Sequence, residues 1–229
     1  MQYETQAVTQ TSALAVEQNK VLRNTYMMLG LTMIPTVIGA FIGTSINFSF
    51  MAANPIMSSL LMFGIMMGML FGVSALRNSV WGIVALLGFT FVAGVFLGPM
   101  LQVALHLRNG VQLIGMAAGG TGIIFLSLAT IATTTKKDFS FMGKFLFIGL
   151  ILLIVASLAN LFFQIPALSL TISAIAVMIF SAYILYDVSR IVHGGETNYV
   201  MATLSLYLDI YNLFIHLLNL LMAFSGERD

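Results

Sequence analysis

The sequence predicts an all-α integral membrane protein, a seven-transmembrane-helix bundle with a polar last helix, and three observations predict it. Of the 229 residues, 59% are hydrophobic and only 7% are charged, whereas a typical soluble domain carries about 25% charged residues. The hydrophobic residues gather in seven runs, each long enough to cross a hydrocarbon layer of about 30 Å as a helix. Transmembrane strands are about half as long and alternate in polarity, which these runs do not.

The seven runs are bounded by polar residues, glycine or proline, and they follow one another with short connections. They cover residues 26–48, 55–76, 80–105, 111–133, 141–163, 166–187 and 199–224. The residues before them are polar and lack the basic start and apolar stretch of a secretory signal peptide. We therefore expect a flexible cytosolic tail at residues 1–24 and a seven-helix transmembrane domain at residues 25–229.

The lysines and arginines predict the orientation in the lipid bilayer. Seven of the nine fall on one side of the predicted spans: Lys20, Arg23, Arg77, Lys136, Lys137, Lys144 and Arg190. Short loops rich in Lys and Arg stay in the cytoplasm, so we expect the N-terminus inside and the C-terminus outside. The formal net charge of +1 gives no reason to expect nucleic acid as a partner.

Glycines repeat at four-residue intervals within four of the spans. Such repeats let helix backbones approach closely, so we expect them to build the bundle, with a dimer interface as the alternative. The repeats are Gly39/Gly43, Gly64/Gly68/Gly72, Gly94/Gly98 and Gly115/Gly119.

Catalytic patterns are missing from the sequence. Cysteine is absent, which excludes a thiolate nucleophile and a cysteine metal site. Neither a zinc-binding pair of glutamate and histidine nor a phosphate-cradling glycine loop occurs. An intramembrane aspartyl protease would need a glycine-flanked aspartate, which neither intramembrane aspartate has. We expect a protein that is not an enzyme and requires no cofactor.

Two aspartates fall within the last two spans. An ionised group at the bilayer centre costs about 3 kcal/mol on insertion scales, so an acidic residue there is a functional candidate by default. Asp187 and Asp209 each lie eleven residues from Asn198, in the loop between the spans. Equal arms of a helical hairpin bring both groups to the same depth, about 16 Å from the apex. We therefore expect the two carboxyl groups to meet.

Such a pair has two uses. Two carboxyl groups in a poorly hydrated site cannot both ionise cheaply, so we expect them to share a proton and to titrate as a unit, as a proton sensor does. When deprotonated, they offer oxygen ligands to a hard cation such as Ca²⁺. The alternatives are that Asp187 pairs with Arg190, one turn away, and that Asp209 is purely structural.

The seventh span also carries a polar stripe at helical spacing. The stripe consists of Ser205, Asp209, Asn212, His216 and Asn219. It either lines a hydrated path or binds the seventh span to its neighbours by hydrogen bonds. His216 is either a proton relay or a hydrogen-bonding member of the bundle. Arg77, at the cytoplasmic end of the second span, is either a counter-ion for the aspartates or a side chain that snorkels to the lipid head groups.

The last third of the sequence resembles the transmembrane Bax inhibitor motif family, also called the Bax inhibitor-1 family. The segments that carry the resemblance are FSFMGKFLFIGLI, ANLFFQIPAL and ILYDVSRIVHGGETNYVMATLSLYLDIYNLFIHLL. With KVLRNTYMMLGLT, FLGPML and TTTKKDFSFMG, it extends from about Lys20 to the C-terminus and is closest to the bacterial YccA-like branch.

The resemblance implies a seven-helix fold in which the last helix is central. It also implies a pH-sensitive leak of cations, chiefly Ca²⁺, across the bacterial inner membrane, gated by Asp187 and Asp209 with Arg77 as the nearest match to a latch. The YccA-like branch implies a different activity, modulation of the membrane AAA protease FtsH by protein–protein contacts in the membrane. Our expectation is the Ca²⁺ leak channel, with FtsH modulation as the alternative.

Overall fold

The computed structural model describes residues 2–135 and 137–226, and their regular secondary structure is helical, without a strand. In chain order the helices are α1 (Gln2–Ser45), α2 (Ser49–Ala53), α3 (Pro55–Leu76), α4 (Val80–Phe96), α5 (Gly98–His106), α6 (Gly110–Thr134), a 3₁₀ turn (Ser140–Met142), α7 (Gly143–Phe163), α8 (Pro166–Val192) and α9 (Tyr199–Gly226). Lys136 and Arg228, two of the residues that entered the predicted orientation, lie outside the described residues.

Seven stretches are long and apolar enough to cross a membrane, which confirms the predicted fold class. Five of them are single helices or parts of one. Helices α4 and α5 together form the third span, Val80–His106, and the 3₁₀ turn together with α7 forms the fifth, Ser140–Phe163. The break between α4 and α5 falls at Leu97, two residues before Pro99 in the first turn of α5. Proline cannot donate a backbone hydrogen bond, so it favours such an interruption.

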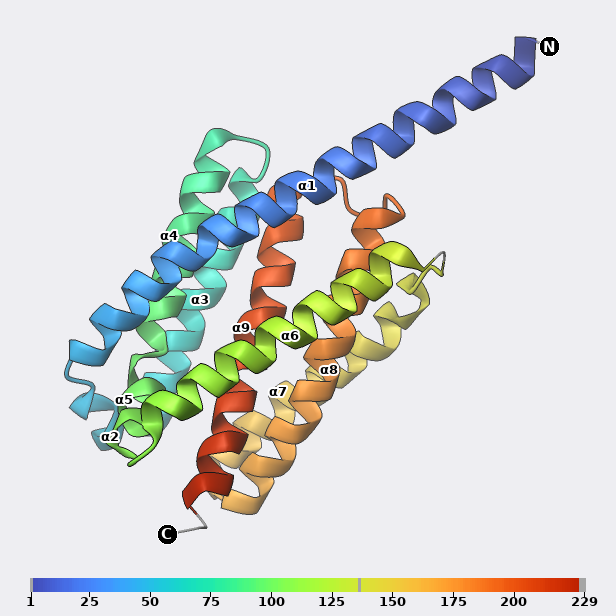
Figure 1. Ribbon diagram of the computed structural model, residues 1–229. Helices are drawn as coiled ribbons and strands as arrows, with labels where there is room; N and C mark the ends of the chain where they lie inside the picture. Colours follow the sequence, from blue (N-terminus) through green and yellow to red (C-terminus); the bar gives the residue numbers. More distant parts are fainter. Residues whose placement is uncertain (1, 136, 227–229) are drawn as a thin grey trace.

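Helix α1 begins at Gln2 and continues without interruption into the span. The division into a flexible cytosolic tail at residues 1–24 and a transmembrane domain stays a prediction. The part that is apolar enough to cross a membrane begins at Val16. The boundary predicted between residues 24 and 25 therefore lies inside a helix. In Figure 1 the N-terminal part of α1 projects beyond the rest of the bundle.

The last helix is central, as the resemblance implied. Helix α9 packs against α1 and α4 on one side and against α6 and α8 on the other (Figure 1). Its side chains Leu206, Tyr207, Leu213 and Leu218 are fully buried. Because α9 has neighbours on both sides, it lies in the interior of the bundle.

The glycine repeats have two different roles. At Gly39 and Gly43 of α1 and at Gly94 and Gly98 of α4 and α5, an added Cβ would overlap with backbone atoms of the facing helix. These glycines build the bundle as predicted, because they allow two backbones to touch.

The prediction was wrong for the other repeats. A Cβ added at the repeat glycines of α3 and α6 would meet no atom of the described residues within 4 Å. These glycines are Gly64, Gly68, Gly72, Gly115 and Gly119.

Candidate functional site

The hairpin of α8 and α9 positions the two aspartates, and its connecting loop is tied down by Asn198. The side-chain oxygen of Asn198 accepts hydrogen bonds from the backbone N–H groups of Val200 (3.0 Å) and Met201 (3.1 Å), which caps the start of α9. Its amide group donates to the carbonyl oxygen of Arg77 (3.2 Å) and to the side chain of Asn78 (2.8 Å). One side chain thus holds the hairpin in register and attaches it to the α3–α4 loop.

The structure brings the two carboxyl groups together. Asp187 of α8 and Asp209 of α9 line the same cavity. Both side chains are buried, with 9% and 5% of the residue surface exposed. Two carboxyl groups in one poorly hydrated site cannot both ionise cheaply, so this arrangement favours a pair that shares one proton and keeps one net negative charge.

Asp209 also presents an unsatisfied acceptor. Its Oδ2 atom is buried and has no hydrogen-bond partner among the described residues. Buried polar atoms are nearly always paired, so each exception calls for a physical explanation. The neighbouring amide of Asn212 does not serve Asp209, because it donates to the carbonyl oxygen of Leu208 at 2.8 Å.

The cation beside the pair is Arg190. Its guanidinium lies 3.8 Å from Asp187 and 3.9 Å from Glu196, donates to the carbonyl oxygen of Gly195 at 3.1 Å and covers the ring of Tyr186. Asp187 therefore lies beside both Arg190 and Asp209. The sequence left a pair with Asp209 and a pair with Arg190 as alternatives, and the structure contains both.

Arg77 is placed differently from the expected latch. Its side chain is exposed and, over the described ranges, forms no ion pair with either aspartate. Its backbone carbonyl instead receives the hydrogen bond from Asn198. The arginine near the aspartates is Arg190, whose position three residues after Asp187 was visible in the sequence.

The aspartate pair lines a cavity of about 640 Å³ between α3 and α7, closed on its inner side by α8 and α9. The outer walls are mostly apolar and include Leu60 and Phe63 of α3 and Ile154 and Leu158 of α7, all of which are also exposed on the outside of the bundle. Helices α3 and α7 scarcely contact each other. The cavity therefore opens sideways, toward the surroundings of the bundle.

The polar stripe of α9 divides between the two predicted uses. Ser205, Asn212 and His216 line the cavity together with Asp209. Asn219 is not among the lining residues. It donates to Ser173 Oγ of α8 at 2.8 Å, and His216 Nδ1 lies 3.1 Å from the same atom. His216 also stacks on Phe180. The stripe thus lines a cavity over most of its length and connects α9 to α8 at its C-terminal end.

The apolar walls of the cavity were not predicted from the sequence. Leu60, Phe63 and Leu158 are typical lipid-facing residues in composition, and only the position of α3 beside α7 makes them part of the site. Ser173 also gave no signal, since a lone serine in a span is unremarkable.

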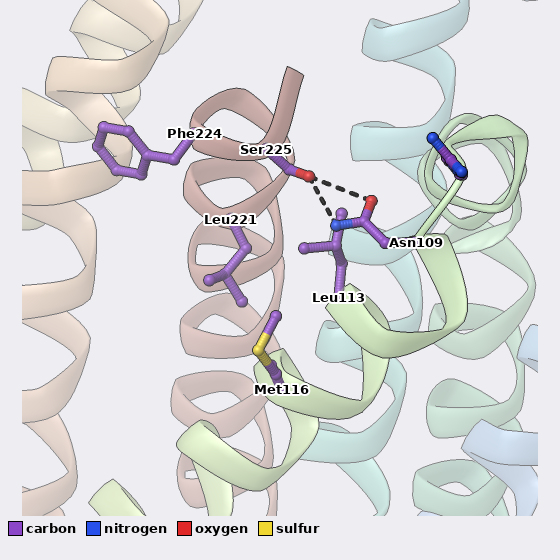
Figure 2. A pocket seen from close by; sticks show the side chains of 7 residues that line it. Asn109, Leu113, Met116, Leu221, Phe224 and Ser225 are labelled. Atoms are coloured by element: carbon purple, nitrogen blue, oxygen red, sulfur yellow. Dashed lines mark hydrogen bonds between the residues drawn. The ribbon is translucent and has the colours of Figure 1, made fainter. Parts of the chain in front are cut away.

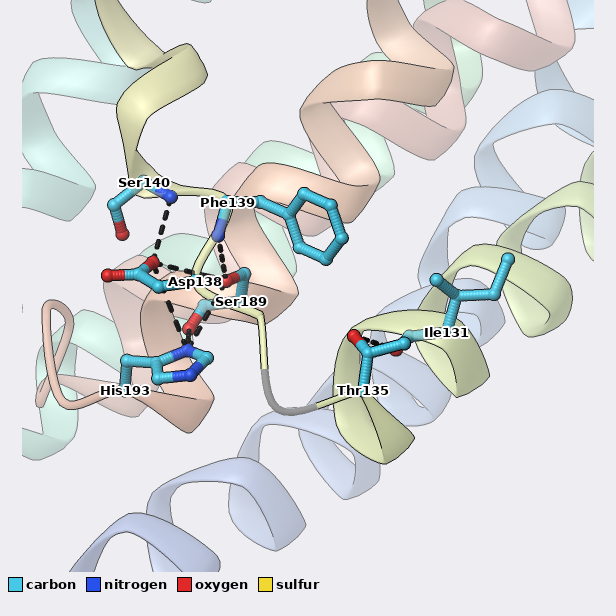
Figure 3. Close-up of polar contacts among 7 residues, drawn as sticks. All are labelled: Ile131, Thr135, Asp138, Phe139, Ser140, Ser189 and His193. Carbon is cyan, nitrogen blue, oxygen red and sulfur yellow. Dashed lines mark hydrogen bonds and ion pairs between the residues drawn. The ribbon is translucent and has the colours of Figure 1, made fainter.

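A second polar cluster joins the loop before α7 to the end of α8 (Figure 3). Ser189 Oγ accepts a hydrogen bond from the backbone N–H of Phe139 at 2.9 Å, and Asp138 accepts one from the N–H of Ser140 at 2.8 Å. His193 Nδ1 lies 4.0 Å from Asp138 Oδ1 and 2.8 Å from the Ser189 carbonyl oxygen. Ser189 is fully buried, so its hydroxyl fastens the loop and is not placed as an accessible nucleophile.

A second cavity, of about 570 Å³, lies at the C-terminal end of α9 (Figure 2). Its polar lining groups include Asn109 and Ser225, which exchange hydrogen bonds of 2.7 and 3.1 Å. Leu113, Met116, Leu221 and Phe224 complete most of the wall. Because Asn109 and Ser225 satisfy each other, this cavity has no counterpart of the unpaired oxygen of Asp209.

Metal ligands are sparse. Within residues 2–135 and 137–226, no three His, Asp or Glu side chains come together. Calcium takes six to eight oxygen ligands, so a Ca²⁺ ion at Asp187 and Asp209 would have to complete its shell mainly with water.

Comparisons with known proteins extend over nearly the whole chain. The model of the family described as inhibitor of apoptosis-promoting Bax1 matches residues 18–226. A membrane protein of Vibrio cholerae is 43% identical over 215 residues, which cover 93% of this chain and 94% of that protein. The Escherichia coli K12 protein named modulator of FtsH protease YccA is 40% identical over 203 residues, 89% and 90% of the two chains. A Neisseria meningitidis protein is 38% identical over 218 residues, 94% and 96% of the two chains.

Proposed function

This chain belongs to the Bax inhibitor-1 family, and from that premise we propose that it modulates a membrane-bound protease of the FtsH type in the bacterial inner membrane. The observation that carries the proposal is the 40% identity to the E. coli modulator over about nine tenths of both chains. The likeness covers 89% of this chain and 90% of the E. coli protein, so it supports a shared mode of action rather than a shared motif.

The projecting end of α1 supports a partner outside the bundle. Residues 2–15 are helical and precede the part of α1 that is apolar enough to cross a membrane (Figure 1). A helix that extends beyond the bundle gives a neighbouring protein a place to bind without disturbing the packed core.

The test is reconstitution with a purified FtsH-type protease and a membrane-protein substrate. We expect the full chain to slow degradation of the substrate, and a variant lacking residues 2–15 to lose most of this effect. The matched controls are Asp187→Asn and Asp209→Asn, which leave α1 unchanged and are expected to modulate the protease as the full chain does. If the substrate is degraded at an unchanged rate when the full chain is in several-fold excess over the protease, the proposal is wrong.

A pH-sensitive cation pathway is the second candidate, and the facing carboxyl groups of Asp187 and Asp209 favour it. In this scheme the shared proton controls how firmly α8 and α9 hold together, and Ca²⁺ or another cation passes when the contact loosens. The test is Ca²⁺ flux into proteoliposomes over a pH series, with Asp187→Asn and Asp209→Asn beside the unmodified chain. A flux whose pH dependence disappears in either variant supports the pathway, and no flux at any pH overturns it.

A further inference from the structure

The cavity between α3 and α7 has walls of two kinds. Hydrogen-bonding side chains of α9 and the Asp187 carboxyl form one wall. The side chains of α3 and α7 form another, which is apolar except for Ser59 and Ser157. The cavity is also long. Its lining residues extend from Ser205 to His216 on α9 and from Ile172 to Asp187 on α8, which corresponds to about 16 and 22 Å at 1.5 Å per residue. The shape and the division of polarity suit an amphipathic molecule.

The polar wall needs a donor. Asp209 lines the cavity, and its Oδ2 atom is buried without a partner within the described part of the chain. Arg190 lies on the Asp187 side of the pair and also contacts Glu196 and Gly195, so it does not serve Asp209. The proton shared with Asp187 serves only one of the two oxygens of Asp209, so a donor for the other must come from the cavity.

The charge of the wall selects the kind of donor. A pair of aspartates that shares one proton keeps one negative charge. Glu196 adds a second negative charge and Arg190 neutralises one of the two, so one negative charge remains for a single positive charge to neutralise. A divalent metal ion is a poor match, because no third His, Asp or Glu accompanies the pair among the described residues. An ammonium group supplies both a single positive charge and N–H donors, and charge-assisted hydrogen bonds of this kind are the strong ones.

We propose that this cavity binds an amphipathic organic ammonium ion, with the ammonium on Asp209 and Asp187 and the apolar body between α3 and α7. The volume of about 640 Å³ lies within the range of small-molecule sites, roughly 300 to 1,000 Å³, which are mostly apolar with a few convergent polar groups. The ligand enters sideways from the lipid, because α3 and α7 scarcely touch and Phe63 and Leu158 are about half exposed at the opening.

The first experiment measures binding of radiolabelled dodecylamine to the purified full chain in nanodiscs, without protease and without Ca²⁺. We expect saturable binding that unlabelled dodecylamine displaces. Dodecyltrimethylammonium, which keeps the charge but has no N–H group, should compete less well. Dodecanol, which has a donor but no charge, and dodecyl sulfate, which is an anion, should compete least.

Two variants locate the site. Asp209→Asn removes the acceptor that carries the charge and should weaken dodecylamine binding about tenfold or more. Leu158→Trp fills the opening from the side of α7 and should also weaken binding. The matched control is Leu152→Trp, a substitution of the same kind on the same helix at an exposed residue that does not line the cavity, and it should bind as the unmodified chain does.

Some results would overturn the proposal. They are uptake that does not saturate, equal competition by dodecanol and dodecylamine, or equal binding by the unmodified chain and the Leu158→Trp variant. Leu158 is apolar and partly exposed, so its replacement leaves the buried polar groups unchanged. The Leu158→Trp variant therefore remains informative even if Asp209→Asn does not fold. The readout is binding alone, so its failure is separate from failure of protease modulation or of cation flux.

Discussion

Tyr207 lies where three helices meet, and its hydroxyl group joins them. The ring is fully buried in α9. The hydroxyl oxygen lies 2.9 Å from Thr36 Oγ1 of α1 and donates to the carbonyl oxygen of Thr90 in α4 at 3.3 Å. A polar group at such a depth is stable only because these partners surround it.

Replacing Tyr207 with phenylalanine should lower the free energy of unfolding by about 1 kcal/mol, the size of a hydrogen bond between membrane helices. Denaturation of the purified protein by SDS in mixed micelles measures the change. Thr130→Val is the control, because the exposed Thr130 hydroxyl bonds only to Leu126 of its own helix. An equal effect of both substitutions would contradict an inter-helix role for Tyr207.

Asp138 lies outside the spans, and hydrogen bonds from the side chain and the backbone N–H of Ser140 hold the pKa of its carboxyl group below its ordinary value. A carboxyl group with a lowered pKa in the folded state contributes stability above its ordinary pKa, and this contribution is lost as the pH falls through the folded value. We therefore expect the α6–α7 loop to stay attached to α8 at neutral pH and to loosen only in acid below the ordinary range of aspartate.

An NMR titration of the Asp138 carboxyl carbon tests this expectation. Ser140→Ala should raise the midpoint toward the ordinary aspartate value, because it removes the side-chain hydrogen bond, the leading cause of the lowered pKa, and keeps the backbone N–H bond. Ser189→Ala is the comparison and should change the midpoint less, since its contact with Asp138 is long, at 3.5 Å. An unchanged midpoint in Ser140→Ala would refute the assignment of the cause.

At the scale of elements, the contact between α1 and α4 depends on glycine. Gly94 of α4 faces the backbone of α1 so closely that an added Cβ would overlap with the carbonyl oxygen of Thr36. Backbone atoms cannot move aside as a flexible side chain can. The two helices would therefore have to separate along their contact.

Gly94→Ala should lower the free energy of unfolding by about 1–3 kcal/mol, the usual range for an overpacked interior. Gly68→Ala is the matched control on α3, where no described atom lies within 4 Å of the added Cβ. It should leave stability unchanged or raise it slightly, because alanine is the better helix former. The same SDS titration compares the two, and similar losses would argue against close packing as the cause.

At the scale of the whole molecule, an odd number of spans predicts that the two termini lie on opposite sides of a membrane. In Figure 1 the start of α1 and the end of α9 lie at opposite ends of the bundle. Which end is inside follows from the lysines and arginines of the short loops and stays a prediction. We expect the N-terminus in the cytoplasm.

Fusions to reporter proteins decide the orientation. Green fluorescent protein joined to the N-terminus should fluoresce, and alkaline phosphatase joined to the C-terminus should be active, because each reporter works on one side of the inner membrane. The exchanged fusions should both be silent. The opposite pattern would show that the charge distribution misled the prediction.

The sequence by itself determined the number of spans, the helical class and the register of the last hairpin. Lipid cannot form hydrogen bonds with backbone N–H and C=O groups, so a long apolar run crosses the membrane as an α-helix, which satisfies these groups internally. Asp187 and Asp209 were predictable as neighbours because both lie on one hairpin, eleven residues from Asn198, where local geometry sets their depth.

Only the tertiary structure determined which residues surround Asp187 and Asp209. Which arginine approaches Asp187, which glycines touch a neighbouring backbone and which apolar residues of α3 and α7 enclose the cavity depend on how helices distant in sequence pack. Gly68 and Gly94 belong to the same kind of repeat, yet one faces open space and the other a backbone. In lipid, apolar residues are equally well solvated on the outside and in the core, so hydrophobicity alone does not show which face of a span is buried.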